Sequence, residues 1–260
     1  MNLLRSAFFT VILTLVTVPY AVLAMLTWPL PPQARYRIIT GWSVIAMWFI
    51  RYVLGIQYRV IGRENLPAEP AVILCKHQSA WETIALQRIF PPVAFVLKRE
   101  LLLIPFFGWG LARMPIISIN RNAGKDALNQ VIDQGKERLA EGFWVVVFPE
   151  GTRSAPGSQK RYKIGGASLA VSANARVVPV AHNAGEFWRR NAFVKQPGDI
   201  VVSIGPVIET MGRSAEEVNQ LTEAWIESEM RRLFPHHFSD NRIPLDIVAD
   251  MDAVKRATSP

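Results

Sequence analysis

The sequence predicts an α/β domain with a mixed, largely parallel sheet flanked by helices, preceded by two apolar N-terminal helices. From about residue 58, short runs rich in β-branched residues alternate with stretches of helical periodicity, a pattern typical of such sheets. The expected strands are residues 58–61, 71–75, 93–97, 116–119, 144–148, 176–180 and 200–204. The clearest helices between them are residues 125–141, 165–173 and 215–233. Sites in sheets of this kind collect at the loops that leave the strand ends.

The first predicted element is a long apolar helix. Residues 7–30 carry no charge, and about 20 apolar residues can span a bilayer. A second apolar stretch, residues 38–56, is interrupted by Arg51. A charge in the middle of the stretch favours a helix that lies in the membrane interface or enters it from one side. Two alternatives stay open: a cleaved signal peptide for the first stretch, and buried helices of a soluble core for both.

The charges around these helices predict an orientation and a division into domains. The arginines after the first stretch outnumber Arg5 before it, and positive residues favour the cytoplasmic side of a membrane. We therefore expect the rest of the chain at the cytoplasmic face. The expected division is residues 1–57 for the membrane-associated helices, 58–235 for the α/β domain and 236–260 for a loosely packed C-terminal tail.

Composition narrows the class of partner. The chain has 260 residues, half of them hydrophobic, and a net charge of +8. A basic surface attracts nucleic acid, anionic lipid or phosphorylated substrates. The sequence has no zinc-finger spacing and no aromatic RNA-binding strand, so we expect no nucleic acid partner. The single cysteine, Cys75, excludes an intramolecular disulfide. It is either a nucleophile or, as we favour, a small buried residue ending a strand.

Polar side chains follow four successive predicted strands. His77 and Glu82 follow residues 71–75, and Asn120 and Arg121 follow residues 116–119. The string Pro-Glu-Gly-Thr-Arg-Ser, residues 149–154, follows the next strand, and His182 and Asn183 follow residues 176–180. Because the carboxyl ends of parallel strands share one edge of a sheet, these groups predict a single composite site.

His77 and Glu82 lie five positions apart, so on one helix they would point roughly 140° apart around the axis. They can meet only if His77 lies in the turn before a helix that runs through residues 83–90. Ser79 as N-cap gives that layout, since Ser79-Ala-Trp-Glu82 fits a capping box. His77 would then be a general base whose tautomer is held by the carboxylate. The alternative is that Glu82 serves only the cap.

Arg121 and Arg153 place guanidinium groups at two strand ends. Buried or half-buried, they would require anions, and phosphate suits their geometry. The alternative is that each is a surface arginine or pairs with an acid such as Glu150. Gly151 allows close approach of the backbone to a ligand. We expect His182 to be a structural histidine rather than a second base.

Several other chemistries leave no trace in the sequence. It lacks the Gly-x-Ser-x-Gly elbow of serine hydrolases and both glycine-rich nucleotide-binding motifs. Its four histidines and one cysteine show no zinc spacing. We therefore expect no metal and no bound cofactor.

Taken in order, the strand ends resemble the sequence blocks of the lysophospholipid acyltransferase family, which includes 1-acyl-sn-glycerol-3-phosphate acyltransferases. The family's His-x-x-x-x-Asp block is matched by His77 with Glu82 in place of Asp. Its Ile-Asp-Arg-like block is matched by Ile119, Asn120 and Arg121, and its Phe-Pro-Glu-Gly-Thr-Arg-Ser block by residues 148–154 in full. A Val-Pro-Val-like strand follows at residues 178–180. The two apolar N-terminal stretches resemble the membrane-docking helices of bacterial members.

The resemblance implies transfer of an acyl group from acyl-CoA or acyl carrier protein, as co-substrate, to the sn-2 hydroxyl of lysophosphatidic acid at the inner membrane. It implies that His77 takes the hydroxyl proton with Glu82 as its partner. The residues implied to hold the glycerol phosphate are Arg121, Glu150, Gly151, Thr152 and Arg153. Another lyso-lipid or glycerol 3-phosphate as acceptor, or a non-catalytic lipid-binding role, are the alternatives.

Overall fold

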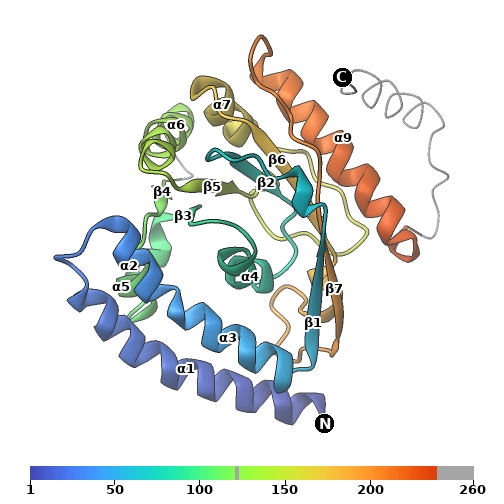
Figure 1. The fold of residues 1–260 in the computed structure, drawn as a ribbon. Coiled ribbons are helices and arrows are strands. Elements are labelled where there is room, and N and C mark those ends of the chain that lie inside the picture. Colours follow the sequence, from blue (N-terminus) through green and yellow to red (C-terminus); the bar gives the residue numbers. More distant parts are fainter. Residues whose placement is uncertain (121–122, 239–260) are drawn as a thin grey trace.

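The computed structural model describes residues 1–120 and 123–238, and its centre is a seven-stranded sheet in the order β1-β7-β6-β2-β5-β3-β4 (Figure 1). The strands are β1 (Ile56–Ile61), β2 (Val72–Cys75), β3 (Val93–Lys98), β4 (Ile117–Ile119), β5 (Trp144–Val147), β6 (Val177–His182) and β7 (Gly198–Ile204). Every neighbouring pair is parallel except β6 and β7. The predicted mixed, largely parallel sheet is therefore confirmed.

The strand directions bring four strand ends to one edge. β4, β3, β5, β2 and β6 all run the same way, whereas β7 and β1 run against them. The loops after β2, β4, β5 and β6 therefore leave the same edge of the sheet. One boundary differs from expectation: β6 continues to His182, so this histidine lies in the strand and not in the following loop.

Alternate residues of the central strands pack on opposite faces of the sheet. In β2, Val72 and Leu74 join the core under α6 (Lys125–Ala140) and α7 (Gly165–Ser172). Ile73 and Cys75 join the core on the other face, against α4 (Trp81–Ile89) and α3 (Gly41–Tyr52). Cys75 is fully buried, as predicted for a small residue at a strand end.

The remaining helices complete the layers (Figure 1). They are α2 (Pro32–Ile39), α5 (Phe107–Leu111), α8 (Ala184–Phe187) and α9 (Ala215–Leu233), with short 3₁₀ turns η1 (Arg63–Asn65), η2 (Arg99–Leu103) and η3 (Pro235–His237). α9 begins with a capping box between Ser214 and Glu217 and packs on β6 and α7. Most of the tail expected after residue 235, residues 239–260, lies outside the described residues.

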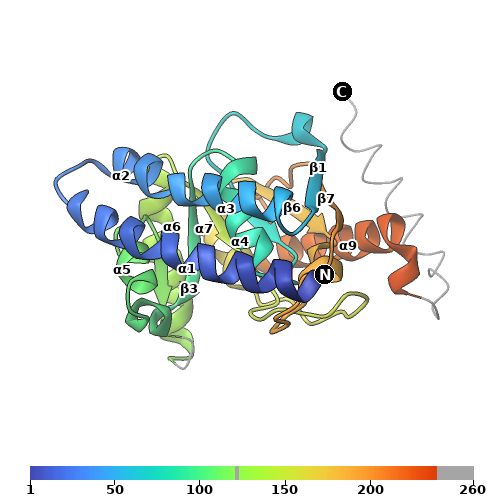
Figure 2. The ribbon, with the colours of Figure 1, turned by 90° about the horizontal axis from the view of Figure 1, so that it is seen from below.

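The N-terminal helix α1 (Asn2–Leu26) is long and apolar enough to cross a membrane by length and composition. A signal sequence or a core helix passes the same test, but only 17% of its most apolar window is buried. The second apolar stretch forms the shorter α3, whose Ala46 and Ile50 enter the core while Trp48 stays exposed. α3 lies between α1 and α4 in Figure 1 and runs beside α1 in Figure 2, and it contacts α1, α4 and β1. It therefore contributes one face to the core.

Candidate active site

His77 lies in the turn between β2 and α4, and its ring reaches Glu82 on the first turn of that helix. The distance from His77 Nδ1 to Glu82 Oε1 is 2.8 Å. The glutamate side chain is fully buried, whereas 15% of the histidine side chain is exposed. Two residues that could not meet on one helix thus meet because the first of them precedes it.

Glu82 also organises the turn itself. The same Oε1 atom accepts hydrogen bonds from the backbone N–H groups of Gln78 and Ser79, at 2.9 and 2.8 Å. Ser79 is nevertheless not the N-cap: the helix is capped at Ala80, and the Ser79 hydroxyl accepts from the nearer Trp81 N–H instead of that of Glu82. The predicted capping box is therefore half formed, because the serine hydroxyl bonds two residues ahead rather than three. One carboxylate oxygen serves both the histidine and the turn.

The electrostatics of the pair define which nitrogen of His77 carries a proton. Burial alone would raise the pKa of Glu82, but the imidazoles of His182 and His77 and the hydrogen bonds it accepts hold that pKa below its ordinary value. Glu82 is therefore a carboxylate at neutral pH and can only accept hydrogen bonds. His77 Nδ1 must carry the hydrogen, so Nε2 carries the lone pair. Phe148 stacks on the ring, with centroids 4.1 Å apart, and fixes its plane.

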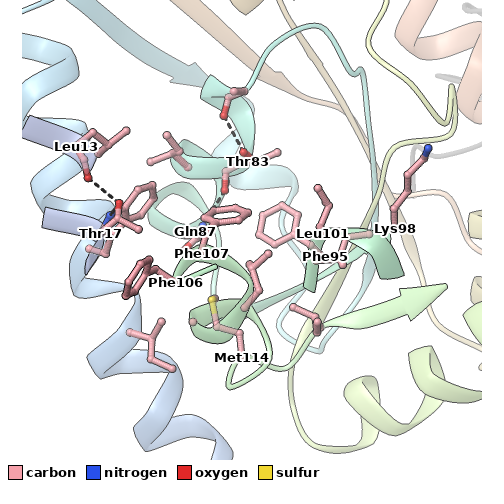
Figure 3. Close-up of a pocket in the computed structure, with 18 of the residues that line it drawn as sticks. Leu13, Thr17, Thr83, Gln87, Phe95, Lys98, Leu101, Phe106, Phe107 and Met114 are labelled. Carbon is pink, nitrogen blue, oxygen red and sulfur yellow. Dashed lines mark hydrogen bonds between the residues drawn. The ribbon is translucent and has the colours of Figure 1, made fainter. Parts of the chain in front are cut away.

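His77 forms part of the wall of a cavity of about 820 Å³. From the strand ends, Gly151, Thr152 and Arg153 also line it, together with Arg190 and Asn191 from the loop after α8. The other walls are largely apolar and come from α1, β3, η2 and α5. Figure 3 shows this part, with labelled residues that include Leu13, Thr17, Phe95, Leu101, Phe106, Phe107 and Met114. The cavity can therefore hold a hydrocarbon chain beside a charged headgroup.

The loop after β5 is fixed directly against His77. The backbone N–H of Ser154 donates to the His77 carbonyl at 2.8 Å, and the Ser154 hydroxyl donates to the same oxygen at 3.1 Å. Gly151 has a φ of +68°, a conformation that favours glycine. These contacts hold residues 151–153 at the cavity wall next to the histidine.

Among the described phosphate-binding candidates, Glu150 stands apart from this wall. Arg121 lies outside the described residues. The Glu150 side chain is 0% exposed and faces the interior, where Oε1 accepts from the His77 N–H at 3.0 Å and lies 3.5 Å from Lys76 Nζ. Glu150 was predicted to hold the glycerol phosphate. Its side chain does not line the cavity and contacts the site through the His77 backbone, so its role toward the phosphate stays a prediction.

His182 is fully buried and both of its ring nitrogens are occupied. Nε2 donates to the Lys76 carbonyl at 2.8 Å, and Nδ1 accepts from the Ala184 N–H at 3.2 Å. Burial lowers the pKa of this imidazole, so it stays neutral. It is the structural histidine that the sequence suggested.

Sequence reasoning missed the cavity residues that come from outside the four strand ends. Arg190 lies 37 positions after Arg153, yet its guanidinium Nη1 is 3.4 Å from the Arg153 carbonyl. No local pattern links the two. The apolar run of residues 101–109, which contributes to η2 and α5, was a usable signal for a binding site. Its leucine, phenylalanine and tryptophan side chains are exposed, and exposed apolar patches mark ligand or membrane contacts.

One group of metal-ligand residue types occurs in the described part of the chain. Ligand atoms of Glu186, His236 and His237 all lie within 4.8 Å of one another. Glu186 Oε1 is 2.8 Å from His237 Nε2 and 3.3 Å from His236 Nε2, which are ion-pair distances. None of the three lines the cavity. No local spacing in the sequence indicates this group, because Glu186 lies 50 positions before His236.

Comparison with known proteins places this site in a family. A family model described as Acyltransferase matches residues 57–183. The 1-acyl-sn-glycerol-3-phosphate acyltransferase of Pseudomonas aeruginosa is 44% identical over 237 residues, covering 89% of this chain and 92% of the relative. The chain belongs to the lysophospholipid acyltransferase family. The human 1-acyl-sn-glycerol-3-phosphate acyltransferase beta is 30% identical over 206 residues, covering 77% of this chain and 73% of that protein.

A solved structure has the same fold. The crystal structure of the 1-acyl-sn-glycerophosphate acyltransferase PlsC from Thermotoga maritima matches with a TM-score of 0.74, covering 94% of this chain and 98% of that chain. At 22% identity this match supports the fold alone. The family predicted from the four strand ends is therefore confirmed, and the fold with it.

Proposed function

We propose that this protein transfers a fatty acyl group from an acyl thioester to the sn-2 hydroxyl of 1-acyl-glycerol 3-phosphate, giving phosphatidic acid. The observation that carries the proposal is a histidine–carboxylate pair in the wall of a cavity of about 820 Å³ that is charged near the histidine and apolar beyond it. The names of the relatives support the same acceptor.

His77 acts as the base. As the acceptor hydroxyl oxygen attacks the thioester carbonyl, its proton passes to His77 Nε2, and Glu82 stabilises the imidazolium through Nδ1–H. The tetrahedral intermediate then collapses, the carbon–sulfur bond breaks, and the imidazolium returns the proton to the thiolate. The new ester and a free thiol are the products. No protein nucleophile is needed, because the thioester is already an activated acyl group.

The acceptor phosphate is held near Arg153. The Arg153 side chain lines the cavity, and its carbonyl accepts from Lys160 Nζ at 3.1 Å and from Arg190 Nη1 at 3.4 Å. Three cationic residues therefore meet at position 153, and two of them, Arg153 and Arg190, line the cavity that His77 faces. Gly151 and Thr152 complete this wall, and we keep Arg121 in the proposal from its sequence block.

The lipid substrate is drawn from a membrane surface. α1 exposes large apolar side chains such as Leu4, Leu15 and Leu26, and its inner face lines the cavity through Leu13 and Thr17. An acyl chain entering beside α1 passes from one apolar environment to another without crossing water. We propose that the protein sits at the cytoplasmic face of the bacterial inner membrane and takes acyl-CoA or acyl carrier protein as donor.

The test is acyl transfer by the purified protein in lipid vesicles. Acyl-CoA and acyl carrier protein are each offered with 1-acyl-glycerol 3-phosphate, glycerol 3-phosphate, a lysophospholipid with a larger headgroup, and phosphate-free monoacylglycerol. We expect the first acceptor to be preferred, with a donor ranking that identifies the thioester used. Activity confined to monoacylglycerol, or equal activity on all acceptors, overturns the proposal.

An arginine variant sharpens this test. Arg153→Gln should raise KM for 1-acyl-glycerol 3-phosphate about 10-fold or more, the cost of one charge-assisted contact, and leave monoacylglycerol kinetics unchanged. Arg161→Gln is the matched control, since Arg161 is exposed and does not line the cavity.

A further inference from the structure

A buried ionic cluster lies directly behind the proposed base. This cluster, hereafter the Lys76 cluster, has four members. They are Lys76 at the end of β2, Glu150 after β5, Tyr162 in the loop before α7, and Glu227 on α9. Lys76 Nζ is 2.6 Å from Glu227 Oε1 and 3.5 Å from Glu150 Oε1. The side chains of the three charged residues are 1%, 7% and 0% exposed. None of the four lines the cavity, so the cluster has no direct contact with substrate.

The charges in the cluster do not balance by themselves. One ammonium faces two carboxylates, and one oxygen of each carboxylate is buried without a hydrogen-bond partner among the described residues. Lys76 also donates to the Ser158 carbonyl at 3.3 Å, and the Tyr162 hydroxyl donates to Glu227 at 2.9 Å. Burial first, and the neighbouring carboxylates next, raise the pKa of Tyr162, so it remains a neutral donor. Lys76 is thus the cation that pairs with both carboxylates.

Besides the peptide bond between Lys76 and His77, the cluster contacts the base through the Glu150 carboxylate. Glu150 Oε1, the oxygen facing Lys76, also accepts the His77 backbone N–H at 3.0 Å. His77 is therefore held at three points: Glu82 binds its ring, Glu150 accepts from its backbone N–H, and Ser154 donates to its carbonyl. Glu227 lies 151 positions from Lys76 in the chain, so the cluster ties α9 to the turn that carries the base.

We propose that Lys76 and Glu227 are positioning residues for the reaction: they set the charge on Glu150, and Glu150 fixes the backbone of His77. The inference rests on the proposed acyl transfer. Glu150 also faces Cys75 from β2, Tyr162 from the loop before α7 and His182 from β6, and the variants below leave these unchanged.

The first test replaces the ammonium by an apolar group of similar length. In Lys76→Met, the buried Glu150 carboxylate loses its counter-charge. Its protonated form is then favoured, and that form is a weaker acceptor for the His77 N–H. At neutral pH kcat should fall about 10–100-fold, as for loss of one hydrogen bond to a charged group, with KM changed less than about twofold. The acid limb of the kcat profile should move to higher pH.

The second test uses the opposite charge. Glu227→Gln removes the competing carboxylate, so Lys76 pairs with Glu150 alone and the charged form of Glu150 is favoured. The acid limb should then move to lower pH, with kcat at neutral pH within about threefold of the wild type. If the acid limb moves in opposite directions in Lys76→Met and Glu227→Gln, the cause is charge, because a packing defect would move the limb the same way in both variants. This variant also tests the inference if Lys76→Met does not fold.

The third test asks whether Lys76 acts through Glu150. In Glu150→Gln the amide oxygen can still accept the His77 N–H, but no charge remains for Lys76 to control. Adding Lys76→Met to Glu150→Gln should therefore lower kcat by less than about a further threefold, and the acid limb of the kcat profile should not move further. Losses that multiply independently overturn the inference, as does wild-type kinetics in folded Lys76→Met. Wild-type protein and His77→Ala are assayed alongside, because an inactive wild type refutes the acyl transfer itself and not the positioning role.

Discussion

His77 and His182 lie at the ends of two neighbouring strands, β2 and β6, and their rings meet very different surroundings. His77 contacts a carboxylate with Nδ1, stacks on Phe148 and faces a cavity. His182 is fully buried and bonds backbone groups with both nitrogens. Among the described residues, no hydrogen bond is made by His77 Nε2.

The difference teaches what makes a histidine a base in this fold. A ring whose two nitrogens are both committed can take a proton only by breaking a hydrogen bond inside the core. A ring with one nitrogen held by a carboxylate and the other facing a cavity can take a proton from a ligand and be stabilised when charged. Both histidines lie at a strand end, so this position does not determine which of them can act as a base.

The largest expected effect comes from removing the base. His77→Ala should lower kcat for acyl transfer by about 10²–10⁴-fold, the usual contribution of a general base. The fold should survive, since the lost side chain borders a cavity and its Glu82 partner keeps two backbone donors. Activity and the melting temperature of the same preparation check this.

His182 gives the reciprocal result. His182→Ala leaves the Ala184 N–H unpaired in the core, which costs about 1–3 kcal/mol, and leaves the Lys76 carbonyl with only the weak thiol donor of Cys75. The melting temperature should fall clearly, while kcat per folded molecule changes less than about tenfold. If the two variants lost activity equally at equal stability, the distinction between the histidines would be wrong.

The next effect concerns the carboxylate that distinguishes the two rings. Glu82→Gln keeps an oxygen for the N–H groups of Gln78 and Ser79 but removes the charge that stabilises the imidazolium. We expect the helix and the fold to remain and kcat to fall by about 10²-fold or more. Glu82→Asp keeps the charge on a shorter side chain and should retain a measurable part of the acyltransferase activity. A fully active Glu82→Gln enzyme would mean that Glu82 serves the turn alone.

Local sequence signals explain how much of the fold could be predicted. All seven strands were found, and the clearest are β2, β5 and β6, whose apolar runs are buried throughout because helices cover both faces of the sheet. α9 was placed at its bounds, since a capping box begins it and Pro235 follows it. α3 is shorter than the apolar stretch that predicted it, because the end of that stretch turns into β1.

The candidate site was less predictable, for a physical reason. A motif gives the order of residues but not the direction in which each side chain points. Glu150 and Arg153 lie three positions apart in one string, yet the first faces the core and the second faces the cavity. Arg190 reaches the same wall from a loop that carries no motif.

A smaller effect on activity is expected from filling the cavity, which His77 lines and His182 does not. Gly110 on α5 lines it, and an added Cβ there would meet nothing within 4 Å. Gly110→Leu should fill part of the apolar space without touching the His77–Glu82 pair. We expect activity with the longest acyl chains to fall about tenfold and activity with short chains to hold, since each buried methylene contributes about 0.8 kcal/mol. Rates across a series of chain lengths check this. Gly110→Ala is the control and should be close to the wild type.

The smallest effect separates the histidines by pH. Burial lowers the pKa of His182 below its ordinary 6.5, so between that value and the native pKa the unfolded chain binds the proton that the folded chain excludes. Stability should therefore be full above pH 6.5 and decline as the pH falls below it, by at most about 1.4 kcal/mol per pH unit.

His182→Gln should abolish the share of this slope that belongs to His182, as measured by denaturant unfolding from pH 7.5 to 5.5. The pKa of His237 is also lowered by burial, so His237→Gln serves as the comparison and should remove a separate share. Glu82 does not enter this window, because its pKa lies below the ordinary carboxyl value of 4.5. An unchanged slope in His182→Gln would mean that the buried ring takes up a proton within the native core. His182 could then no longer be separated from His77 by its inability to accept one.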